Sequence, residues 1–165
     1  MLQNYHYKQN ITCLSNVELD EIKKQYPEIS TIIGDARKMH IDNKSFDIVY
    51  SNATIEHVGD FENQIKFVSE CCRVSKKYVF IQTPNRFYPI EIHTKLPFIH
   101  FLPEKIYRKV LKFIGFSFYA DINNLNLLSK KKMLYITDKL NIRSFKLIEH
   151  KFLGFVSNLI LIIKL

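Results

Sequence analysis

The sequence is poor in glycine, and this scarcity excludes the common phosphate-binding loops. Its 165 residues include only four glycines, none of which lies within five residues of another. A dinucleotide-binding GxGxxG turn and a P-loop both need clustered glycines, because only glycine lets the backbone approach a phosphate closely. Both motifs are therefore absent from this chain.

Cysteines and long apolar runs are also scarce. The three cysteines form an odd number, and two of them, Cys71 and Cys72, are adjacent, which fits neither a disulfide framework nor the spacing of zinc ligands. A reducing, cytoplasmic location is the simplest interpretation. The longest apolar candidate, residues 158–165, is far shorter than the roughly 18 to 20 residues that cross a bilayer. Residues 1–10 are polar, so we expect neither a membrane span nor a secretory signal.

Acidic residues are outnumbered by basic ones. The chain has 24 Lys and Arg against 16 Asp and Glu, which gives a formal net charge of +8. Such an excess suits an anionic partner such as nucleic acid, a phosphorylated glycan or lipid headgroups. No nucleic-acid-binding module is recognisable, so nucleic acid is not expected as the partner. The length and the hydrophobic fraction of 47% suit one domain with a buried core, residues 1–165.

The first half of the sequence alternates predicted strands with predicted helices. We predict strands at residues 11–14, 29–33, 46–50 and 78–81, and helices at residues 17–25 and 61–74. The second helix has an apolar stripe at helical spacing and Asp60 as its N-cap. The run 78–81 is apolar without alternation, which is typical of a strand buried on both faces. This order of elements is typical of right-handed βαβ units in a mostly parallel α/β sheet.

The second half is less regular. Residues 104–115 form an amphipathic helix whose predicted inner face is Ile106, Val110 and Ile114, and Ser129 can cap another helix that runs to about residue 140. Two final strands, at residues 142–152 and 155–164, meet near Gly154. A tight connection there makes them an antiparallel hairpin at the edge of the sheet.

Polar residues follow each predicted strand of the first half. In open α/β sheets, ligands bind beyond the carboxyl ends of the strands, so these residues are the candidate site. They are Ser15 and Asn16, then Asp35 and Ala36, then Ser51, Asn52 and the stretch 55–57, then residues 83–86.

Several of these segments resemble a known enzyme family. Residues 34–36 (GDA), 42–52 (DNKSFDIVYSN) and 55–58 (IEHV) resemble the class I S-adenosylmethionine-dependent methyltransferases, most closely the type 11 branch. Residues 82–94 and 96–103 are similar to a run in bacterial members linked to surface-glycan or small-molecule methylation. The resemblance implies a Rossmann-like fold, S-adenosylmethionine as cofactor and methyl transfer to a small-molecule or glycan acceptor. A lipid-linked acceptor, with peripheral membrane contact through the basic helix at residues 104–115, is an alternative; a lid over the pocket is another role for that helix.

The resemblance also assigns cofactor contacts. Asp35 matches the acid that accepts a hydrogen bond from the adenine amino group, with the Ala36 N–H facing the ring. Ser51 and Asn52 match the loop at the methionine end of the cofactor. At the ribose hydroxyls, where the family has an acidic residue, this chain has Ser15 and Asn16. A turn after the strand is the structural alternative for Asp35.

Acceptor-side residues are matched in the same way. Glu56 and His57 fall at the mouth of the acceptor pocket, and the candidate bases for removing an acceptor proton are His57, Glu91 and His93. A capping or core role is the alternative for each of them. His93 and His100 have no cysteine or acid at ligand spacing, so no metal site is predicted.

The front of the chain departs from the family. In the family, a first strand lies at the centre of the sheet and is followed by a glycine-rich loop. The ten residues before Ile11 are too few for that strand and a crossover connection, which needs at least about 10 to 12 residues. We therefore expect a sheet that lacks this strand, with two neighbouring edges unpaired. The alternative to an enzyme or its C-terminal portion is a non-enzymatic remnant or interaction module that no longer binds the cofactor.

Overall fold

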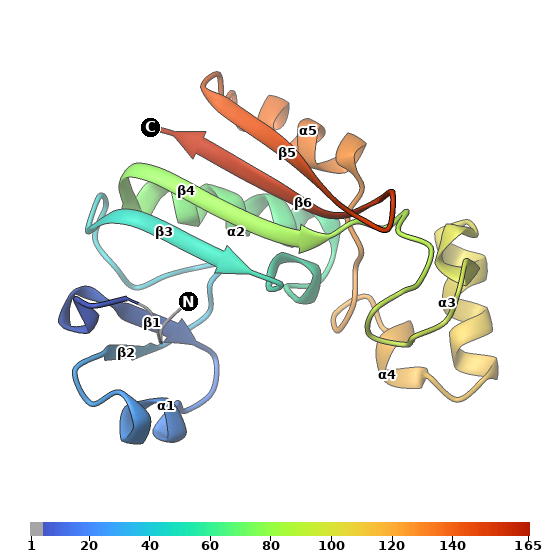
Figure 1. Ribbon diagram of the computed structural model, residues 1–165, viewed down its shortest axis with the longest axis horizontal. Coiled ribbons are helices and arrows are strands. Elements are labelled where there is room, and N and C mark those ends of the chain that lie inside the picture. The colour runs from blue at the N-terminus through green and yellow to red at the C-terminus, as the bar shows by residue number, and fades with distance from the viewer. Residues whose placement is uncertain (1–4) are drawn as a thin grey trace.

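The computed structural model describes residues 5–165 and contains two separate β-sheets (Figure 1). The smaller sheet pairs β1 (Thr12–Ser15) with β2 (Ser30–Ile33) in parallel. The larger sheet has the spatial order β3-β4-β6-β5 and is formed by β3 (Phe46–Asn52), β4 (Ser75–Pro84), β6 (Phe155–Lys164) and β5 (Phe145–Phe152). Within the described residues neither β1 nor β3 has a second partner strand, as the sequence predicts for a sheet without the family's first strand.

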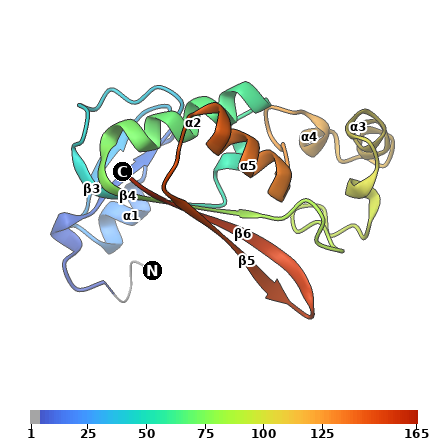
Figure 2. The same cartoon turned by 90° about the horizontal axis from the view of Figure 1, so that it is seen from above.

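The helices lie mainly on one side of the larger sheet. They are α1 (Asp20–Gln25), α2 (Phe61–Val74), α3 (Glu104–Phe113), α4 (Ser117–Ala120) and α5 (Lys130–Lys139), with 3-10 turns η2 (Lys8–Asn10), η3 (Ile55–His57) and η4 (Ile99–Phe101). Figure 2 shows α2 and α5 over one face of the sheet, and α3 and α4 beyond its end. None of the helices described between residues 5 and 165 is long and apolar enough to cross a membrane.

Local sequence signals determine the ends of α2 and α5. The Asp60 carboxylate accepts a hydrogen bond from the Asn63 backbone N–H at 2.9 Å, and the Ser129 hydroxyl accepts one from Lys132 at 3.4 Å. Both predicted caps are confirmed. Helix α1 begins three residues later than predicted, because the Ser15 hydroxyl accepts the Val17 N–H at 3.2 Å and holds the chain in a turn.

The predicted mixed topology is also present. Strands β3 and β4 are parallel and joined through α2, whereas β6 runs antiparallel to both β4 and β5. The β5–β6 hairpin turns at Leu153 and Gly154, whose φ angles are 50° and 83°. Positive φ at both central residues is the geometry of a two-residue type I′ turn, which matches the twist of the flanking strands.

The core lies between the larger sheet and its two helices. Val79 and Ile81 of β4, Leu161 of β6, Val68 of α2 and Ile136 of α5 are all fully buried in one cluster. Burial of such side chains contributes about 1.5 to 3 kcal/mol each, so this layer is the main source of stability for the sheet edge that carries the site.

The prediction that the strand at residues 78–81 is buried on both faces is wrong. Tyr78 is 37% exposed, and on the same face of the neighbouring strand Ile48 and Tyr50 are 55% and 46% exposed. Helices α2 and α5 pack on the opposite face (Figure 2). An apolar run in the sequence does not indicate whether other elements pack on the second face of the sheet.

The predicted inner face of α3 is wrong as well. Ile106 and Ile114 are 49% and 41% exposed, whereas Tyr107 and Leu111 are buried. The buried pair packs against Ala120 of α4, which approaches that side of the helix. The helix was assigned from its own periodicity, and the position of α4 decides which of two apolar stripes is covered.

Candidate functional site

The turn η3 places Glu56 and His57 just after the carboxyl end of β3. The buried side chain of Gln64 on α2 holds this turn, because its Nε2 donates to the carbonyls of Ile55 at 3.1 Å and Asn126 at 2.7 Å. The Asn126 N–H in turn donates to the Glu56 carbonyl at 2.7 Å. The turn is therefore fixed between α2 and the segment that precedes α5.

A second group of polar residues follows the carboxyl end of β4. Glu91 is 3% exposed, and its Oε1 accepts hydrogen bonds from the His93 backbone N–H at 3.0 Å and from His93 Nδ1 at 2.6 Å. Its Oε2 accepts the Thr94 N–H at 2.7 Å. The carboxylate thus organises the loop and fixes the orientation of the His93 ring.

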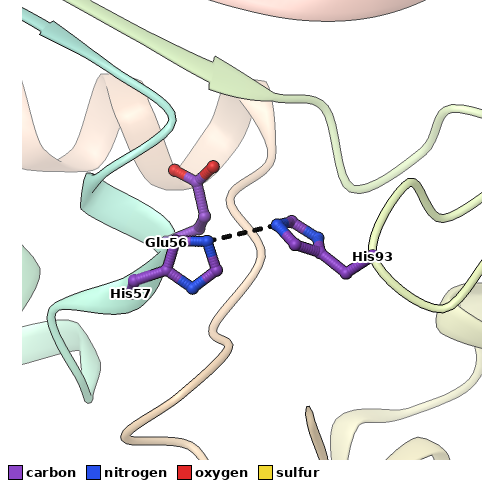
Figure 3. Close-up of side chains that lie close together, drawn as sticks. All are labelled: Glu56, His57 and His93. Carbon is purple, nitrogen blue, oxygen red and sulfur yellow. Dashed lines mark hydrogen bonds between the residues drawn. The ribbon is translucent and has the colours of Figure 1, made fainter. Parts of the chain in front are cut away.

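The two groups meet through their histidines (Figure 3). The Nε2 atoms of His57 and His93 are 3.1 Å apart, and His57 Nδ1 lies 2.6 Å from the carbonyl oxygen of Asn124. Glu56 is fully buried beside them, with Oε2 accepting from the Thr83 hydroxyl at 2.9 Å. Its Oε1 has no hydrogen-bond partner among the described residues.

Burial and hydrogen bonding separate the acid strengths of the two carboxyls. Burial alone would raise the pKa of Glu91, but hydrogen bonds from His93 and Thr94 outweigh it and lower the pKa to about 2. The hydrogen bond to Glu91 raises the pKa of His93 against the effect of burial. Burial raises the pKa of Glu56, whose hydrogen bonds do not offset it. The site therefore combines a carboxylate of lowered pKa, an imidazole of raised pKa and a buried carboxyl of raised pKa.

The residues predicted to bind the adenosyl group lie at the ends of β1 and β2. The Asp35 carboxylate is engaged by Arg37, with Oδ1 accepting the Arg37 backbone N–H at 2.8 Å and Oδ2 accepting Nη2 at 2.7 Å. This is the structural alternative considered for Asp35, and its adenine contact stays a prediction. Ala36 is half-buried against the core, Ser15 holds its local turn, and Asn16 is exposed.

Ser51 and Asn52 lie inside β3, not in the loop after it. Their backbones pair with Ile81 and Gln82 of β4, which extends the strand two residues beyond the predicted end. Asn52 is exposed, and the buried hydroxyl of Ser51 has no hydrogen-bond partner in the described part of the chain. Their roles at the methionine end stay predictions.

The structure brings together only part of the predicted site. His57, Glu91 and His93 form one cluster, and Glu56 joins it. His100 lies outside it, because its ring is buried with Nε2 on the Tyr88 carbonyl at 2.7 Å. A spacing rule could not have found Glu56, His57 and His93 as a ligand set, since 36 residues separate the two histidines.

A cavity of about 310 Å³ lies at the opposite end of the sheet. It is lined by residues of α2, the loop after α5 and the end of β6, including Cys72, Arg143 and Leu165. Lys164 pairs with Tyr78 near the start of β4, so this hollow faces the amino ends of the parallel strands. It is therefore separate from the histidine cluster at their carboxyl ends.

Comparison with known proteins supports the predicted family resemblance. A family model described as a methyltransferase domain matches residues 4–81, the segment that holds β1 to β4 up to Ile81. This match supports, over residues 4–81, the predicted resemblance to the class I S-adenosylmethionine-dependent methyltransferases. The match also supports S-adenosylmethionine as the cofactor. No curated protein matches the sequence.

Solved structures confirm the predicted fold. A protein from Pyrococcus horikoshii has a TM-score of 0.65 and 17% identity, over 99% of this chain and 74% of that one. A possible histamine N-methyltransferase from Thermotoga maritima has a TM-score of 0.57 and 16% identity, over 92% and 71%. The 1,6-didemethyltoxoflavin-N1-methyltransferase of Burkholderia thailandensis, with bound S-adenosylhomocysteine, has a TM-score of 0.56 and 7% identity, over 94% and 60%.

The polar residues present fit the cofactor in their chemistry. A buried hydroxyl without a partner, as at Ser51, is costly unless a ligand pairs it, and it stands at the strand end where the resemblance puts the methionine moiety. Asp35 keeps acceptor capacity, because each carboxylate oxygen has two lone pairs and the side chain is 48% exposed.

Proposed function

We propose that this methyltransferase transfers a methyl group to a hydroxyl or amine of a small-molecule or glycan acceptor, with His93 as the base. The observation that carries the proposal is the Glu91–His93 pair, joined at 2.6 Å beyond the carboxyl end of β4. A carboxylate that orients a histidine and increases its basicity is a recurrent arrangement for removing a proton. The position matches the edge at which open α/β sheets bind ligands.

When bound, S-adenosylmethionine supplies an electrophilic methyl group on its sulfonium sulfur. The residues we assign to holding it are those at three successive strand ends: Ser15 and Asn16, Asp35 and Ala36, Ser51 and Asn52. The main task of the protein in such a displacement is to position the donor and the acceptor.

The histidine pair is suited to receiving the acceptor's proton. Glu91 accepts the Nδ1 hydrogen of His93, so the lone pair of that ring is on Nε2. Nε2 faces His57, whose own Nδ1 hydrogen is held by the Asn124 carbonyl. The two Nε2 atoms can therefore take up one additional proton between them. The Glu91 carboxylate balances the positive charge that this proton adds.

A lipid-linked acceptor is the variant of this proposal that the surface supports. The segment that carries Glu91 and His93 also exposes Phe87, Phe98 and Phe101, and the rings of Phe87 and Phe98 both contact Phe101. Exposed aromatic side chains near basic residues can enter the headgroup region of an anionic membrane. Comparing a free glycan with the same glycan on a lipid carrier in vesicles distinguishes the two acceptors.

The experiment that tests the proposal is a binding and turnover assay on the purified chain. We expect saturable heat on titration with S-adenosylmethionine and release of S-adenosylhomocysteine with hydroxyl- or amine-bearing acceptors. No saturable binding at millimolar S-adenosylmethionine would favour the alternative, an interaction module that has lost cofactor binding.

A further inference from the structure

Hydrogen bonding determines where the protons of the histidine pair lie. His57 Nδ1 contacts a carbonyl oxygen and His93 Nδ1 contacts a carboxylate oxygen, both at 2.6 Å. These oxygens only accept, so both Nδ1 atoms carry a hydrogen. Each neutral ring then has its lone pair on Nε2, and the two Nε2 atoms are 3.1 Å apart. Two facing lone pairs repel, so a positive centre between them, a proton or a metal ion, is needed.

A third donor lies beside this pair. Glu56 is fully buried, and its Oε1 is without a partner among the residues the structure describes. One carboxylate oxygen of Glu56 and one nitrogen of each histidine all lie within 4.8 Å of one another. Figure 3 shows the two imidazole rings facing each other, from η3 and from the segment after β4, with the Glu56 side chain beside them. A buried carboxylate is unfavourable without a cation to balance it.

We propose that Glu56, His57 and His93 form a binding site for a divalent transition-metal ion of the zinc type, with a carboxylate oxygen and both Nε2 atoms as ligands. Two imidazole nitrogens bound to tetrahedral zinc at about 2.0 to 2.1 Å lie about 3.3 Å apart, close to the separation in this structure. Two histidines and one carboxylate are a ligand set typical of zinc and iron(II) sites that keep open coordination positions. The Glu56 side chain needs only to move closer to the pair to complete the set.

The surroundings of the cluster are those of a metal site. Histidine ligands usually donate their second N–H to a carboxylate or a backbone carbonyl, which fixes the ring and raises its basicity. Glu91 does this for His93, and the Asn124 carbonyl does it for His57. The two carboxylates, Glu56 and Glu91, balance the charge of a divalent ion.

Metal binding has a consequence for the proposed reaction. The ion and the acceptor's proton compete for Nε2 of His93, so a bound ion slows methyl transfer that uses this base. This competition between ion and proton rests on the proposed function, whereas metal binding itself does not. The metal site and the proposed function can therefore be disproved independently.

The test is metal binding to the purified full chain. After treatment with a chelator and its removal, the protein is titrated with Zn²⁺ by calorimetry and with Co²⁺ by visible absorption. For the wild-type chain we expect one bound ion and the visible absorption bands of Co²⁺ in a low-symmetry site. His57→Ala and His93→Ala should lose this ion. Glu91→Gln should bind it about 10- to 100-fold more weakly. His40→Ala, which changes an exposed histidine outside the cluster, is the matched control.

The outcomes are separable. His57 is exposed, so His57→Ala is the variant that keeps the fold even if a substitution at buried Glu56 does not. Absence of binding to the wild-type chain overturns the site, as does binding that is unchanged in both His57→Ala and His93→Ala. Stoichiometric metal binding, together with no methyl transfer by the chelator-treated, metal-free chain, would overturn the proposed function alone.

Discussion

His57 and His93 face each other through their Nε2 atoms at 3.1 Å, although 36 residues separate them in the chain. The contact forms because each histidine follows a strand of the same parallel pair, β3 and β4, at its carboxyl end. Each ring is held from behind by an acceptor on its Nδ1 atom. The pair is therefore preorganised.

Replacing His93 by alanine should lower the rate of methyl transfer by about 10² to 10⁴, the usual contribution of a positioned general base. The loss should appear in kcat, measured as S-adenosylhomocysteine release at saturating cofactor. His40→Ala is the control for removal of a histidine from the surface. An unchanged kcat in His93→Ala would show that the acceptor needs no base at this position.

Replacing Asp35 by alanine should weaken binding of S-adenosylmethionine by about 1 to 3 kcal/mol, because the adenine amine would lose its acceptor. Arg37 provides the control, since it holds the Asp35 carboxylate through three nitrogen atoms. Arg37→Gln removes the ion pair and keeps the carboxylate, so the Kd from calorimetry should change little. Equal losses in the two variants would show that Asp35 acts only by stabilising the turn after β2.

Stability should fall at acidic pH through Glu70. Its hydrogen bond from Arg73, helped by one from the Met39 backbone and outweighing burial, lowers the pKa of this carboxyl. A folded-state pKa below the unfolded value, about 4.3, contributes stability that is fully present above the unfolded value. That contribution is lost as the pH falls through the folded-state pKa.

Glu70→Gln should therefore lower the free energy of unfolding at pH 7 by about 1.5 to 3 kcal/mol, the range for a hydrogen bond to a charged group. The difference from the wild type should shrink as the pH falls below 4, as measured by urea denaturation across pH. Glu28→Gln, at an exposed position, is the control. A difference that stays constant with pH would contradict the role of the Glu70 charge.

Gln64 should be a positioning residue for the turn that carries His57. Gln64→Leu keeps the volume and removes the donors to the carbonyls of Ile55 and Asn126. Leaving buried carbonyls unpaired should lower the free energy of unfolding by about 1 to 3 kcal/mol. The displaced turn should also shift the NMR signals of the His57 ring, which a remote loss of stability would not do. Gln25→Leu, on exposed α1, should do neither.

The local elements were determined by the sequence. The apolar stripe and Asp60 cap of α2, the Ser129 cap of α5 and the hairpin at Gly154 all depend on residues close together in the chain. The same holds for the end of β2, which Asp35 follows closely, because the run of apolar residues stops there. Each of these features follows from backbone geometry and near-neighbour hydrogen bonds, which a single sequence records.

Only the tertiary structure decided which faces are covered and which polar residues meet. Tyr78 is exposed because α2 and α5 both pack on the other face, and Tyr107 is buried because α4 approaches that side of α3. Glu56, His57 and His93 become neighbours because parallel strands bring their carboxyl ends to one edge. Contacts between segments far apart in the chain depend on how whole elements pack, and no spacing within one segment encodes them.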